Sequence, residues 1–159
     1  MAEQPQANGE GQAQAAQARL SILTQYVKDM SFENPRAPYG VQQGARPEIQ
    51  IQVDVRAAAV GETQYEVVLD LNVNAKSGDN SVFLVELAYG GLFALENIPA
   101  DSLQPLLLIE CPRLLFPFAR RVVADATRDG GFPPLMIDPI DFVQLFRRRV
   151  QQGGETVQA

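Results

Sequence analysis

Hydrophobic and polar residues alternate along most of the first half of the chain. In the segment 47–57, PEIQIQVDVRA, isoleucine or valine occupies every second position from 49 to 55 and polar residues lie between them. Segments 65–73 and 82–89 continue this period of two. Such alternation is typical of strands that bury one face against a core. These segments predict three strands.

A further strand is predicted over residues 20–33, where the alternation is less regular. Apolar residues fall at many even positions from Leu20 to Phe32, but Lys28 interrupts them. Asp29 and Glu33 fall on the opposite side. The pattern therefore displays two carboxylates along one side of a strand whose other side belongs to the core.

The connections indicate how these strands pair. The turns GETQ and KSGDN are short, as between antiparallel neighbours, whereas the segment 34–46, NPRAPYGVQQGAR, is long enough to cross over the sheet.

The second half of the chain predicts two helices. Segment 114–131, LLFPFARRVVADATRDGG, has apolar residues at helical spacing and ends in two glycines, with Pro117 marking either a kink or the first turn. Segment 138–150, DPIDFVQLFRRRV, has Asp141 in position to cap a second helix. Strands followed by helices indicate an α+β fold, in which a four-stranded antiparallel sheet carries the helices on one face.

Composition divides the chain into a folded domain and two tails. Residues 1–19 consist mainly of Ala, Gln and Gly and offer little to bury, and residues 151–159 are similar. We expect both to be disordered. Residues 20–150 form one domain, and a hydrophobic content of 46% is sufficient for its core.

Charge and residue types exclude several functions. A net charge of −6 disfavours nucleic acid as a partner. The chain has no histidine and one cysteine, so it lacks a histidine base, an internal disulfide and an evident metal site. Cys111 fits a buried small residue. We expect no catalysis, no cofactor, no metal and no signal peptide or membrane insertion, and we expect a cytoplasmic location.

Five segments together resemble one family. The segments YVKDMSFENP, YEVVLDLNVNA, VFLVELAYGGLF, CPRLLFPFAR and GGFPPLMIDPIDF occur here in an order and spacing similar to those of SecB, the cytosolic bacterial chaperones that hold precursor proteins unfolded and deliver them to the SecA motor. The resemblance spans roughly residues 20–150. It implies a four-stranded antiparallel sheet with a long helix, assembled as a homotetramer, a dimer of dimers with helices between two eight-stranded sheets.

The same resemblance implies a docking site for SecA on the outer face of the sheet. Its positions in this sequence are Asp29, Glu33, Leu84 and Glu86. The alternation supports this placement, because Phe83, Val85, Leu87 and Tyr89 form the buried side of their strand, in the core or at an oligomer interface. The zinc of SecA's partner module belongs to the motor.

The resemblance also implies client grooves lined by the crossover loop, the second strand and the helices. Several aromatic residues lie where regular elements do not obviously bury them: Tyr39, Phe93, Phe116, Phe118 and Phe132. We expect these rings to line the grooves, although each could instead fill the core beneath its loop.

Two other classes of protein remain open. An adaptor or structural domain would bind one folded partner and ignore denatured chains. A small-molecule binding domain, built on a helix-covered curved sheet, would show stabilisation by its ligand and a closed pocket.

Overall fold

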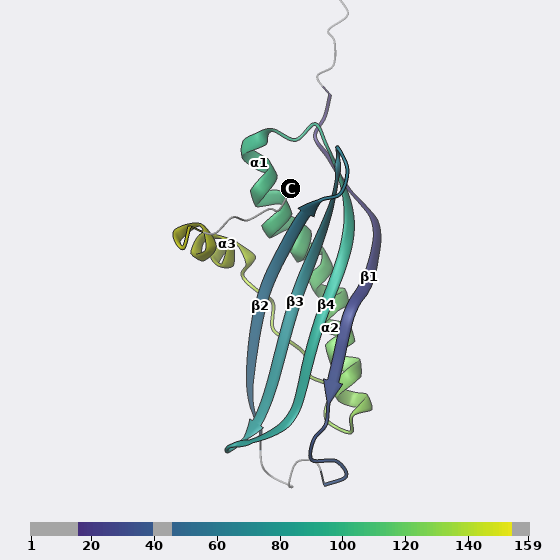
Figure 1. Ribbon diagram of the computed structural model, residues 1–159, viewed down its shortest axis with the longest axis vertical. Helices are drawn as coiled ribbons and strands as arrows, with labels where there is room; N and C mark the ends of the chain where they lie inside the picture. The colour runs from purple at the N-terminus through teal and green to yellow at the C-terminus, as the bar shows by residue number, and fades with distance from the viewer. Residues whose placement is uncertain (1–15, 40–45, 154–159) are drawn as a thin grey trace, which may run out of the picture.

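The computed structural model describes residues 16–39 and 46–153. It contains one four-stranded antiparallel sheet, in the order β1-β4-β3-β2. The strands are β1 (Arg19–Glu33), β2 (Glu48–Ala59), β3 (Gln64–Ser77) and β4 (Asn80–Glu96) (Figure 1). Consecutive strands β2, β3 and β4 are neighbours, whereas β1 and β2 lie at opposite edges. The antiparallel sheet and the crossover predicted from the sequence are confirmed; the middle of the crossover, residues 40–45, lies outside the described residues, as do most of the two predicted tails.

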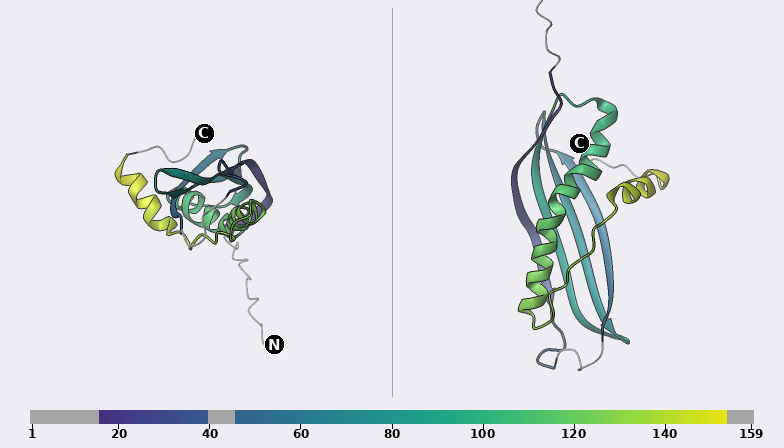
Figure 2. Two further views of the ribbon diagram at one scale, coloured as in Figure 1. Left: turned by 90° about the horizontal axis from the view of Figure 1, so that it is seen from below. Right: turned by 180° about the vertical axis from the view of Figure 1, so that it is seen from behind.

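The helices follow the sheet in the chain. The long helix consists of α1 (Ala100–Pro105), a π-helical segment η1 (Leu106–Glu110) and α2 (Cys111–Asp129) without interruption. A shorter helix, α3 (Phe142–Gln151), follows an extended segment. The long helix runs along one face of the sheet and α3 lies at the β2 side (Figures 1 and 2). The predicted α+β arrangement is confirmed, and Asp141 caps α3 by accepting a hydrogen bond of 3.0 Å from the Gln144 backbone N–H.

The long helix begins earlier than the sequence suggests. The prediction started it near residue 114, with Pro117 as a kink or the first turn, but the helix begins at Ala100 and Pro117 lies inside α2. The π-helical segment explains how it continues past Pro105 and Pro112. There the Cys111 N–H donates to the Leu106 carbonyl, one residue further back than in an α-helix, so the backbone adapts where proline has no N–H to donate.

The core lies between the sheet and the long helix. The largest fully buried side chains there come from the inner face of the sheet, the long helix and the start of α3, and include Phe93, Leu69, Leu71, Leu107, Leu115 and Phe142. At the end of α2, the segment that leads to α3 is tied back by a buried threonine. The Thr127 hydroxyl lies 3.1 Å from the Val123 carbonyl oxygen and 3.0 Å from that of Ala124, and it accepts a 2.9 Å hydrogen bond from the Leu135 N–H.

We expect Thr127→Val to lower the free energy of unfolding by about 1 to 2 kcal/mol, because the shape is retained while the Leu135 N–H loses its acceptor. Thr127→Ser keeps the hydroxyl and should stay closer to the unaltered chain. Urea unfolding at one fixed protein concentration measures both. A valine variant as stable as the serine variant would show that this hydrogen bond contributes nothing.

Candidate functional site

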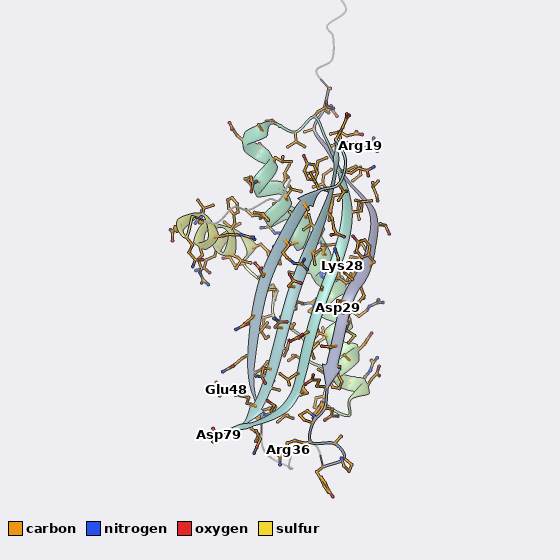
Figure 3. The ribbon with its side chains drawn as sticks, viewed as in Figure 1. Arg19, Lys28, Asp29, Arg36, Glu48 and Asp79 are labelled. Atoms are coloured by element: carbon orange, nitrogen blue, oxygen red, sulfur yellow. The ribbon has the colours of Figure 1, made fainter. Side chains whose placement is uncertain are left out.

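The face of the sheet that points away from the helices is polar, and it holds all four predicted docking residues. Strands β1 and β4 are paired so that Glu33 lies opposite Leu84, Ser31 opposite Glu86 and Asp29 opposite Ala88. Asp29, Glu33 and Glu86 are exposed, and Leu84 is half-buried. We call Asp29, Glu33, Leu84 and Glu86 the acidic surface. Figure 3 labels Asp29 on β1, the edge strand that carries it.

The alternation along β1 is broken by two bulges. The pairing with β4 shifts between Ile22 and Thr24 and again between Val27 and Asp29. Each bulge inserts one residue and reverses the side on which the following residues lie. Tyr26 is therefore on the outer face, whereas an uninterrupted even-numbered stripe would place it in the core. The two reversals cancel, so the prediction for Asp29 and Glu33 agrees with the observed face although it was wrong for the middle of the strand.

Two basic residues near the middle of the outer face are paired with carboxylates of β3, whereas the carboxylates of the acidic surface are not paired. Lys28 forms an ion pair of 2.6 Å with Glu66, and Arg56 forms one of 2.6 Å with Asp70. Within the part of the chain that the structure describes, Asp29, Glu33 and Glu86 form no ion pair and no side-chain hydrogen bond.

These pairs shift the ionisation of the groups that form them. The hydrogen bond from Lys28, followed by that from Tyr26, holds the pKa of Glu66 below its usual range, so this carboxylate is charged and already neutralised by a cation. Burial, and then the same bond to Glu66, raises the pKa of Tyr26 to about 12. The carboxylates of the acidic surface are therefore left without an ion-pair partner among the described residues, and such an arrangement beside an apolar side chain can attract a basic partner.

The five aromatic residues predicted to line a groove are in different environments. Tyr39 is 87% exposed and Phe118 is 45% exposed, so both can contact another molecule. Phe132 is half-buried and lies against Phe83, with ring centroids 5.0 Å apart. Phe93 is 0% exposed and Phe116 is 6% exposed. In this chain these last two rings fill the core, as the alternative interpretation allowed, because β4 and the long helix enclose them.

The four residues predicted for the core or an oligomer interface all lie in the core of the single chain: Phe83, Val85, Leu87 and Tyr89. Other large apolar side chains remain exposed, among them a group on β1 and a pair on α2. On β1 they are Ile22, Leu23, Val27 and Met30, and on α2 they are Leu114 and Phe118. The sequence reasoning assigned no partner-contacting role to the β1 residues, and the interrupted alternation around them was the available signal.

The single cysteine and the possible metal ligands were the remaining candidates for a reactive site. Cys111 is buried, as predicted, and burial followed by the charge of Glu110 raises the pKa of its thiol to about 12, so the nucleophilic thiolate is scarce. No group of three or more possible metal ligands occurs in residues 16–39 and 46–153. Over the same residues, none of the helices combines the length and apolar character needed to cross a bilayer.

Comparisons with known proteins agree on one family. The family model described as "Preprotein translocase subunit SecB" matches residues 13–153. "Protein-export protein SecB" of Afipia carboxidovorans is 55% identical over 145 residues, covering 91% of this chain and 90% of the relative. The protein of the same name from Sinorhizobium medicae is 56% identical over 146 residues, covering 91% and 87%.

A solved structure shares the fold. It is that of a SecB-like chaperone of Mycobacterium tuberculosis in complex with a peptide from an antitoxin. The likeness has a TM-score of 0.66 at 14% identity, and covers 77% of this chain and 91% of that one.

Proposed function

The chain belongs to the SecB family, and from this premise we propose that it is a protein-export chaperone that binds unfolded precursor proteins, keeps them competent for translocation and delivers them to the SecA motor. The observation that carries the proposal is the match over residues 13–153, together with relatives named protein-export protein SecB at 55% and 56% identity. Such a chaperone has no need of catalysis or a cofactor, and we place its work in the cytoplasm.

Binding of clients is supported by exposed apolar side chains. Tyr39 and Phe118 lie at the surface, and a promiscuous chaperone needs apolar area that tolerates many sequences. The structural neighbour from Mycobacterium tuberculosis was solved with a bound peptide. We propose that this chain also binds segments of its clients, and that these segments are extended, with Phe132 at the margin of the groove and with Phe93 and Phe116 supporting it from the core.

Docking of SecA is supported by the acidic surface. Asp29, Glu33 and Glu86 carry charge that no cation of the described residues neutralises. Glu33 lies opposite the half-buried Leu84, and Glu86 lies two positions from it on the same face of β4. Charges at the margin speed the encounter with a basic partner, and the leucine adds a desolvated contact. This face is on the opposite side of the sheet from the long helix, so SecA and helix-bound client segments need not compete.

Assembly is supported by the edge strand β1. Ile22, Val27 and Met30 are exposed on its helix-facing side. An edge strand with exposed apolar residues invites pairing with another chain unless it is covered. We propose that β1 pairs with its copy to form an eight-stranded sheet, and that two such dimers form the homotetramer by packing their helices together.

We expect the protein to suppress aggregation of several unrelated unfolding substrates. Before a substrate is added, its mass should be that of four chains. Turbidity and light scattering recorded on the same mixture measure aggregation and complex mass together. An adaptor would ignore denatured chains, and a small-molecule binding domain would be stabilised by its ligand instead. A monomeric mass at micromolar concentration, or protection of one substrate only, would contradict the proposal.

A further inference from the structure

Tyr26 and Lys28 on β1 both reach Glu66 on β3, across the intervening strand β4. The Tyr26 hydroxyl donates to one carboxylate oxygen of Glu66, and the Lys28 ammonium donates to the other over 2.6 Å. Because β4 lies between β1 and β3, both side chains must pass over it on the outer face.

Gly90 of β4 makes room for the tyrosine. It lies opposite Tyr26, and a Cβ atom at this position would be 2.5 Å from the Tyr26 Cε2 atom. The ring therefore lies directly over the backbone of β4, where only glycine has no side chain to displace it. The contact from β1 to β3 depends on this gap.

The second bulge of β1 lies at the same place. Lys28 has no partner on β4, and Val27 and Asp29 lie opposite the consecutive residues Tyr89 and Ala88. Lys28 and Asp29 consequently both point to the outer face, which only a bulge allows for adjacent residues of a strand. With strict alternation after Tyr26, Asp29 and Glu33 would turn toward the helices and leave the acidic surface.

The ion pair with Glu66 also keeps the positive charge of Lys28 away from Asp29. Lys28 is adjacent to Asp29 in the chain, and its ammonium would partly neutralise that carboxylate if it were free. In the structure it is held over the centre of the sheet instead.

We propose that Tyr26, Lys28 and Glu66 form a register clamp: positioning residues that hold the bulge at Lys28 in place and so direct Asp29 and Glu33 outward to a basic partner. The proposal rests on the proposed function in taking that partner to be SecA. The clamp residues need not touch the partner. The clamp residues affect binding of the partner indirectly, because they determine on which face of the sheet Asp29 and Glu33 lie.

Replacement of Lys28 by methionine tests the clamp, because the clamp and a simple effect of charge predict opposite changes in the affinity for SecA. Removing a cation beside an acidic docking surface should strengthen the binding of a basic partner if only charge matters. The clamp instead predicts weaker binding of SecA, by threefold or more, because β1 loses its bulged register. Arg56→Met is the matched control. It removes the cation of the ion pair between Arg56 on β2 and Asp70 on β3, which does not reach β1, and it should leave the affinity for SecA unchanged or slightly higher.

Calorimetric titration of SecA into the unaltered chain, Lys28→Met and Arg56→Met gives the three dissociation constants. The mass of each variant shows whether the assembly is intact. Tighter binding of Lys28→Met, or equal losses in both variants, would overturn the clamp.

A second measurement reads the register without SecA. Asp29 and Ala88 lie directly opposite each other, so cysteines introduced at both positions are within reach of a disulfide. The buried Cys111 does not compete. We expect mild oxidation to form the bond quickly in this background, and at least fivefold more slowly when Lys28→Met and Glu66→Gln are added. Equal rates would reject the clamp even if SecA binds. If SecA fails to bind the unaltered chain, the docking proposal fails, while the disulfide rates still decide on the clamp.

Discussion

Phe93→Ala is expected to lower the free energy of unfolding by about 3 to 5 kcal/mol, the loss typical of a large aromatic side chain removed from a core. Phe93 is 0% exposed, and its ring lies beside Gly91 and near Leu115. The surrounding strand and helix are too constrained to fill the space that the ring leaves, so a cavity remains. Phe118→Ala should cost less than about 1 kcal/mol, because Phe118 is 45% exposed.

Variants at Phe93 and Phe118 also distinguish a ring that fills the core from a ring that contacts the client. Both rings were candidates for the client groove from the sequence, but only Phe118 offers surface to a client. We expect Phe118→Ala, together with Tyr39→Ala, to weaken the holding of an unfolded substrate while mass and SecA binding stay unchanged. Urea unfolding and the aggregation assay measure the two effects. A stable Phe93→Ala variant that has lost client binding would place Phe93 in the groove after all.

Phe93 is buried and Phe118 is exposed, and this difference could not be predicted from the sequence. The alternation of β2 and of residues 65–73 in β3 is nearly regular, so the faces of these segments could be predicted residue by residue. Whether a ring next to glycine or proline is buried depends on what packs over it. For Phe93 that is decided in part by Leu115, which lies on a helix whose start the sequence did not reveal.

The start of the long helix was missed for a local reason. Proline is normally a sign of a helix boundary, and the segment from residue 105 to 117 contains three. The π-helical turn over Leu106–Glu110 lets the helix continue through these prolines, and the sequence LLLIE of this segment contains no recognisable signal for such a turn.

The sequence correctly predicted the face of the sheet on which Asp29 and Glu33 lie, but it did not reveal why they lie there. Strict alternation placed Asp29 and Glu33 away from the core, and two bulges that cancel preserve that result. The ion pair between Lys28 and Glu66 joins residues 38 positions apart, in strands that are not adjacent, so no local pattern indicates it. In the sequence Lys28 is only an interruption of the apolar stripe. In the proposed register clamp it is one of the residues that direct Asp29 and Glu33 outward.

Reversing the charge of the acidic surface is expected to have the largest effect on SecA. Asp29→Lys and Glu86→Lys should each weaken binding about tenfold or more at low salt, or about 1.4 kcal/mol, because each replaces an attraction with a repulsion within the acidic surface. The effect should shrink as salt rises, since the Debye length falls from about 10 Å at 0.1 M to about 3 Å at 1 M.

Glu48→Lys supplies the control for net charge. Glu48 is exposed on β2, at the edge of the sheet opposite β1, and its reversal changes the total charge by the same amount (Figure 3). We expect the dissociation constant of this variant for SecA to stay within about twofold of that of the unaltered chain, because Glu48 is two strands from β4 and three from β1 and its charge is largely screened there. Calorimetric titration of all three variants at two ionic strengths makes the comparison. Equal weakening by Glu48→Lys would mean that SecA responds to the total charge of the chaperone, and unchanged affinity in both Asp29→Lys and Glu86→Lys would remove the acidic surface as its docking site.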